Sequence, residues 1–158
     1  MVVSARTVQL DRTVDRDAAC SWYHRTSEAG TKGIFAAGNF QIPPRPSGHY
    51  DYTKGVYFMN TRDHPRATHW GDWVVRACVK GTFIDVNGDG PDYWKFRDQF
   101  NYLHGNGDDE YDAIRAAYPD VDGMRIRVGA KDTMLVVWNP DVIQPLFPFI
   151  FDPAIYRF

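Results

Sequence analysis

The chain has 158 residues, a formal net charge of −2 at pH 7, 44% hydrophobic residues and 24% charged residues. This length suits one domain with a single core, and the balanced charge disfavours a non-specific binder of nucleic acid or membrane surfaces, which is usually basic. No apolar run approaches the roughly 18–20 residues that span a bilayer, and the start of the chain lacks the basic-then-apolar order of a secretory signal. We therefore expect no membrane contact and a cytoplasmic location, in the producing cell or in a target cell.

The first half of the chain predicts two strands that flank a helix. Aromatic and β-branched residues indicate a strand over 21–27. A short helix is expected within 28–40, where Gly38 acts as a C-terminal stop. Three prolines and a glycine predict a loop over 41–54, and GVYFMN at 55–60 is the next strand.

The second half predicts further strands and helices. Residues 61–71 are expected to form a turn and then one or two helical turns. The expected strands are 72–86, 124–128 and 133–139, and the expected helices are 91–103 and part of 110–123. The stretch 139–146 is expected to be an exit turn. The element order favours an α+β class with antiparallel or mixed sheets over strict βαβ winding.

No linker or repeat divides the chain, so we expect one domain over 1–158. Residues 1–20 alternate only weakly and are interpreted as a short strand or an N-terminal arm. Residues 147–158 form an apolar C-terminal tail that is expected to pack on the body, with a docking surface for a partner as the alternative.

The cysteines and histidines give no sign of a reactive or metal-binding site. Cys20 and Cys78 could form one disulfide, but two free cysteines in a reducing compartment are favoured. The five histidines show no metal-ligand spacing. The stretch 85–92 resembles the start of a calcium loop, yet its twelfth position would be Phe96 rather than glutamate, so a simple turn is favoured. No metal is expected.

Four stretches occur in an order that resembles a known family. They are WYHRTS (22–27), GIFAAGNF (33–40), GVYF with RATHW (55–70) and MLVVWNPDVIQPL (134–146). This order resembles the ADP-ribosyltransferase fold of the poly(ADP-ribose) polymerase and diphtheria-toxin branch. The resemblance implies two small, mostly antiparallel sheets with short helices around a cleft that binds NAD.

The resemblance also implies roles for particular residues. His24 would donate to a ribose hydroxyl of NAD, and the backbone of Arg25 would pair with the carboxamide. Tyr57 would give a flat face for the nicotinamide ring. The hydroxyl of Thr26 or Ser27 would touch the nicotinamide or ribose. His69 or Trp70 would close the other side of the ring.

The chain departs from the family at two positions. Arg25 replaces the usual glycine after the histidine, and its side chain could reach the pyrophosphate. Met134 stands where the family's catalytic glutamate normally stands. Asp132 lies two residues earlier, on the same face of an extended strand, and is the candidate acid, with a solvated turn aspartate as the alternative. Asp122 and Glu110 are reserve candidates.

The resemblance predicts a mono-ADP-ribosyltransferase that transfers ADP-ribose from NAD to a macromolecular acceptor and releases nicotinamide. A protein acceptor is favoured over nucleic acid, the setting is expected to be a bacterial toxin or effector, and an antitoxin or immunity protein is a further candidate partner. The alternatives are an NAD glycohydrolase, which uses water as acceptor, and a degenerate module that only binds NAD or ADP-ribose. His24, Tyr57 and Asp132 are the catalytic candidates.

Overall fold

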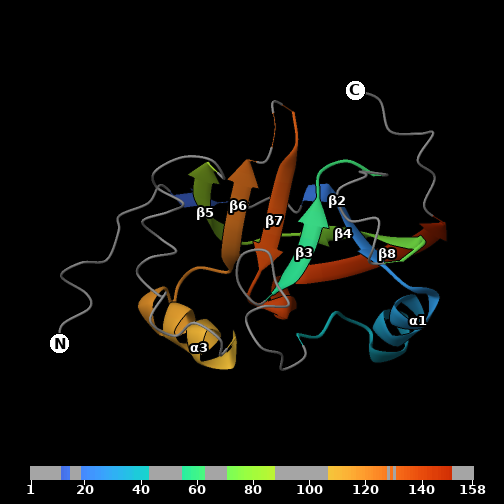
Figure 1. The fold of residues 1–158 in the computed structure, drawn as a ribbon, viewed down its shortest axis with the longest axis horizontal. Coiled ribbons are helices and arrows are strands. Elements are labelled where there is room, and N and C mark those ends of the chain that lie inside the picture. The colour runs from blue at the N-terminus through green and yellow to red at the C-terminus, as the bar shows by residue number, and fades with distance from the viewer. Residues whose placement is uncertain are drawn as a thin grey trace.

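The computed structural model describes residues 12–14, 19–42, 55–62, 71–87, 107–127, 129 and 131–150. The strands in this part of the chain are β1 (Arg12–Val14), β2 (Ala19–Thr26), β3 (Val56–Met59), β4 (Trp73–Val79), β5 (Thr82–Asn87), β6 (Gly123–Arg127), β7 (Thr133–Val137) and β8 (Ile143–Ile150). The helices are α1 (Glu28–Ala37), α3 (Gly107–Ala117) and the 3₁₀ helix η5 (Pro140–Val142). Figure 1 shows their arrangement.

The described strands form one eight-stranded mixed sheet, in the order β1-β5-β6-β7-β3-β2-β4-β8. Only β5 and β6 run parallel; every other neighbouring pair is antiparallel. The α+β class is confirmed, but the prediction of two separate sheets is wrong for the described strands. The two halves remain joined because Tyr23 on β2 pairs with Met59 on β3, and this is the only paired position between those strands.

The connection between β4 and β5 forces this sheet to curl. Only Lys80 and Gly81 lie between the end of β4 and the start of β5, and three residue steps span at most about 11 Å. In a flat sheet, the five strand spacings from β4 to β5 would cover about 24 Å. Figure 1 shows the result: β5, β6, β7 and β3 stand upright while β4 and β8 run across them.

The curled sheet has one hydrophobic cluster on each face. We call the enclosed side the inner face; its buried residues are Trp22, Phe40, Val56, Phe58, Val75, Ala77, Val79, Phe83, Leu135, Val137 and Ile143. The other side, the outer face, is covered over β5, β6 and β7 by α3, through Ile114, and by Tyr118 just after it. Burial of apolar area on both faces supplies the main stabilising free energy.

Helix α1 begins and ends where its sequence dictates. The Ser27 hydroxyl accepts a 3.0 Å hydrogen bond from the Gly30 backbone N–H, and Glu28 places negative charge in the first turn. Gly38 follows the helix with φ of 78°, a left-handed conformation that glycine adopts without a steric penalty. The predicted helix and its stop are confirmed. Among the described helices, none has the length and hydrophobicity required to cross a membrane.

The predicted strand 72–86 is in fact two strands. The chain turns at Lys80 and Gly81, and β5 then joins the opposite end of the sheet order. Asp122 holds this turn, because its carboxylate accepts from the Thr82 N–H at 3.0 Å and its own N–H donates to the Thr82 carbonyl at 2.8 Å. The apolar alternation continues through the turn, so the pattern alone gave one long strand.

The predicted exit turn at 139–146 is also wrong. The chain forms η5 and then the strand β8, which pairs with β4 at the edge of the described sheet. Pro145 and Pro148 fit there because an edge strand tolerates residues without a backbone N–H. The predicted tail 147–158 enters β8 up to residue 150; the rest, most of the predicted loop 41–54 and the predicted helix 91–103 lie outside the described residues.

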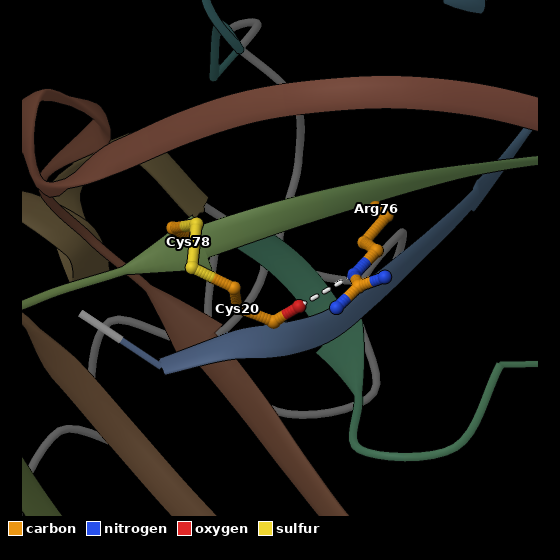
Figure 2. The surroundings of a disulfide bond; sticks show 3 residues. All are labelled: Cys20, Arg76 and Cys78. Atoms are coloured by element: carbon orange, nitrogen blue, oxygen red, sulfur yellow. Dashed lines mark hydrogen bonds between the residues drawn. A yellow bond between two sulfur atoms is a disulfide. The ribbon is translucent and has the colours of Figure 1, made fainter.

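Cys20 and Cys78 form a disulfide between β2 and β4, so the prediction of two free cysteines is wrong (Figure 2). The two strands are neighbours in the sheet, which brings residues 58 positions apart in sequence into contact. Arg76 lies beside this bond, where its Nε–H donates to the Cys20 carbonyl oxygen at 2.6 Å. The disulfide therefore fixes the β2–β4 pair at the end that leads into the β4–β5 turn.

Removing this disulfide should lower the free energy of unfolding. Because the bond closes a long loop in the unfolded chain, the double variant Cys20→Ala/Cys78→Ala should lose about 2–4 kcal/mol in urea denaturation. Wild-type protein treated with reductant is the matched control, since it loses the bond but keeps both side chains. An unchanged urea midpoint after reduction, with two free thiols found in the untreated protein by mass spectrometry, would show that the bond does not form.

Candidate functional site

His24 is half-buried on the inner face, against two rings of the hydrophobic cluster there. Its ring contacts Phe40 and Phe58 at centroid distances of 5.0 and 5.7 Å. Its Nδ1–H donates to the Tyr57 carbonyl oxygen at 2.7 Å. Burial lowers the pKa of His24 below its ordinary value, and the hydrogen bond to Tyr57 opposes this effect only in part. The ring is therefore neutral near pH 7 and links β2 to β3.

Tyr57 and Arg25 lie on the opposite, outer face. Tyr23 pairs with Met59, and side chains two residues apart on a strand share a face. The half-buried Tyr57 accordingly packs against the outer cluster. The structure thus brings His24 to the backbone of Tyr57 but places the two rings on opposite sides of the sheet, whereas it places Arg25 and Tyr57 on the same side.

The end of β2 is tied down by its own backbone neighbours. Gly71 approaches the Thr26 backbone so closely that a Cβ atom at position 71 would overlap it, and its φ is 133°. The Nε–H of Arg25 donates to the Gly71 carbonyl oxygen. The Ser27 hydroxyl, a candidate ligand contact, serves as the α1 cap. This close packing holds Arg25 and Thr26 in place at the strand end.

Met134 is a core residue. It pairs with Met59 across β7 and β3, it is 5% exposed, and it belongs to the outer cluster. A carboxylate at this position would be buried among apolar side chains, which costs free energy unless it is paired or hydrogen-bonded. The methionine is therefore consistent with its surroundings, and the catalytic glutamate of the resembling family has no counterpart there.

Asp132 lies in the turn between β6 and β7. It is half-buried, and its carboxylate lies against Gly129. Asn60 fixes both of its neighbours, because the Asn60 side chain donates to the Lys131 carbonyl and accepts from the Thr133 N–H, each at 3.0 Å. Sequence reasoning did not single out Asn60, whose only signal is an amide directly after a strand.

The candidate acid and the candidate platform are not in direct contact. Tyr57 pairs with Val136 of β7. Asp132 precedes Val136 by four residues, which corresponds to about 13 Å along an extended strand. A ligand stacked on Tyr57 would meet Asp132 only if it extended along β7 towards Asn60. The structure therefore places Asp132 near Met134 but does not assemble it with Tyr57.

The reserve residues do not complete the site. Asp122 is structural: besides holding Thr82, its carboxylate accepts from the Asn139 amide at 3.1 Å. Glu110 lies in α3, and its side chain is not described. His69 and Trp70 lie outside the described residues. In the part of the chain that the structure describes, no group of three or more histidine, cysteine or acidic side chains could hold a metal ion.

Comparison of the chain with protein-family models, with curated proteins and with solved structures finds no match.

Replacing His24 should change how stability depends on pH. The pKa of His24 is lowered in the folded state, so as the pH falls below about 6.5 the unfolded chain takes up a proton at His24 before the folded chain does. The free energy of unfolding therefore decreases with falling pH until the pH reaches the lowered pKa of the folded state. His24→Asn keeps an N–H donor near the Nδ1 position but does not titrate. As the pH is lowered from 7, the free energy of unfolding of His24→Asn should fall less than that of wild type. The difference between the two proteins should grow by at most about 1.4 kcal/mol per pH unit.

Chemical denaturation of both proteins over this pH range measures the difference. Histidines elsewhere in the chain contribute equally to both curves, so the difference isolates His24. Parallel stability curves would mean that the His24 ring is solvated in the folded protein.

Proposed function

We propose that this chain is an ADP-ribosyltransferase-like domain that binds NAD and transfers one ADP-ribose to a macromolecular acceptor, with release of nicotinamide. The supporting observation is the strand order β7-β3-β2. These strands carry Met134, Tyr57 and His24, the positions on which the family resemblance rests. They are widely separated in sequence, and a chance likeness between short motifs would give no reason for them to be neighbours in the sheet.

In this proposal the outer face beside β3 holds the ligand. Tyr57 offers a half-buried ring for the nicotinamide, and aromatic stacking contributes about 0.5–1.5 kcal/mol beyond the buried area. Arg25 lies on the same face and supplies positive charge for the pyrophosphate, where guanidinium groups form strong charge-assisted hydrogen bonds. His24 acts as a positioning residue, because its hydrogen bond to the Tyr57 carbonyl fixes the strand that carries the platform.

The reaction requires a group that stabilises positive charge on the ribose as nicotinamide leaves. Asp132 is the described carboxylate nearest in sequence to the family's glutamate position. It lies two residues before Met134, immediately ahead of β7. It would act on the part of the ligand that extends from Tyr57 towards Asn60. A carboxylate acting in this way lowers the barrier and contributes little to ground-state binding.

A second candidate function is binding of NAD or ADP-ribose without turnover. Two observations favour it: Met134 is buried where the family has its glutamate, and the ring of His24 lies on the other face from Tyr57. Measured release of nicotinamide separates the two candidates. Transfer of labelled ADP-ribose to a macromolecule, detected by mass spectrometry, separates the transferase from a glycohydrolase.

Loss of the Tyr57 ring should weaken NAD binding. Tyr57→Leu should reduce affinity by about three- to tenfold, on the scale of one stacking contact, whereas Tyr57→Phe should keep most of it. Isothermal calorimetry with NAD measures both. Phe35→Ala is the matched control, since it removes an exposed aromatic ring from α1. The platform is refuted if wild type and Tyr57→Leu bind NAD equally.

Neutralising Asp132 should reduce turnover and leave binding intact. Asp132→Asn should slow release of nicotinamide by about 10²-fold, the usual loss for one electrostatic group at a transition state, with nearly unchanged NAD affinity. Asp141→Asn, at an exposed carboxylate in η5, is the control. An active Asp132→Asn protein would place the acid elsewhere. A wild type that binds NAD but releases no nicotinamide would establish the binding module.

A further inference from the structure

The outer face of β2, β4 and β8 carries aromatic rings and arginines outside the part covered by α3. We call it the aromatic–arginine surface and define it by residues from these strands and from the turn after β3: Tyr23, Arg62, Arg76, Phe147 and Phe149. Tyr23 pairs with Arg76, and Arg76 pairs with Phe147, so the three side chains form a row across the sheet. None of these contacts depends on the proposed NAD site.

The three rings on this surface contact one another at interplanar angles of 48° for Phe147 with Phe149 and 69° for Tyr23 with Phe149. The centroids of Phe147 and Phe149 are 6.3 Å apart, and those of Phe149 and Tyr23 are 6.2 Å apart. Phe147 is 47% exposed, so nearly half of its surface is accessible to solvent. Both phenylalanines come from alternate positions of β8, so the strand geometry fixes their spacing.

Positive charge accompanies each phenylalanine. The guanidinium of Arg62 lies 4.0 Å from the centre of the Phe149 ring, and that of Arg76 lies 5.6 Å from the centre of the Phe147 ring. Strands β2, β4 and β8 contain no aspartate or glutamate. Among the described residues, Arg76 has no carboxylate partner; its Nε–H donates to the Cys20 carbonyl. The surface therefore complements an anion that carries flat, apolar groups.

We propose that the aromatic–arginine surface binds single-stranded nucleic acid, through ring stacking and locally placed arginines rather than through the net charge of the chain, which is −2. Sheets that bind single strands stack successive bases on aromatic side chains and hold the phosphates with arginine or lysine. Three neighbouring rings offer more stacking positions than one mononucleotide can fill. A second copy of this chain fits less well: like-charged arginines would face each other, and Pro145 and Pro148 hinder strand addition along the β8 edge.

The disulfide joins two of the strands that carry this surface. Figure 2 shows Arg76 beside the Cys20–Cys78 bond, with its guanidinium turned to the Cys20 carbonyl. The bond ties together the two strands that carry Tyr23 and Arg76, which keeps the row in register before a ligand arrives. Preorganisation of this kind lowers the entropic cost of binding.

The test is fluorescence anisotropy of labelled oligo(dT) and oligo(U) of about 12 nucleotides, a length within the range of single-strand sites. Wild type should bind in the micromolar range at about 50 mM salt, and log affinity should fall against log salt with a slope of about −0.7 for each phosphate contact. Phe147→Ala should weaken binding about five- to a hundredfold. Arg76→Gln should weaken it and reduce the slope by about 0.7.

Ile150→Ala is the matched control, because Ile150 lies on the same strand, is 64% exposed and belongs to the opposite face. It should bind like wild type, and circular dichroism should show all variants folded. The proposal is overturned by no binding up to about 100 µM protein, by equal loss in Phe147→Ala and Ile150→Ala, or by a preference for duplex. A trinucleotide that binds as tightly as the full oligonucleotide would overturn the multi-ring site.

Discussion

The two-residue connection between β4 and β5 is the constraint on which the rest of the fold depends. Lys80 and Gly81 join strands that lie five positions apart in the sheet order. The sheet can satisfy this connection only by curling until its two halves face each other. The curl creates an enclosed inner face, and Asp122 secures it by accepting hydrogen bonds from both the start of β5 and Asn139.

Curling also decides which side chains of the sheet lie in the enclosed core. Inner-face positions such as His24 become part of a core, where burial keeps the imidazole neutral. The outer face holds Tyr57, Arg25 and the aromatic–arginine surface, and it also includes buried positions such as Val74. Alternation along β2 therefore places adjacent residues on opposite faces, and it is Arg25 rather than His24 that shares a side with Tyr57.

Local features of the sequence predicted much of the fold. Ser27 and Gly38 mark the ends of α1, and aromatic and β-branched residues mark β2 and β3. The split into β4 and β5 was missed because apolar alternation runs through a two-residue turn. Strand β8 was missed because its prolines are typical of turns, and they are acceptable only because β8 lies at an edge.

The candidate site was predicted less well, since it depends on relations between distant strands. The motifs located His24 and Tyr57 on neighbouring strands, but the pairing of Tyr23 with Met59 sets their faces, and no local pattern encodes this register. In the same way, the burial of Met134 follows from its pairing with Met59 and not from its own neighbours in sequence. The disulfide likewise depends on the adjacency of β2 and β4.

The single paired position between β2 and β3 has a consequence for motion. Elsewhere in the described sheet, neighbouring strands share several paired positions, whereas this junction relies on Tyr23 with Met59 and on the His24 hydrogen bond. Local opening needs the least free energy where the fewest hydrogen bonds must break. The sheet should therefore move as two rigid halves about the junction between β2 and β3. Tyr57 lies on one half and Arg25 on the other, so a ligand that contacts both side chains would restrict this motion.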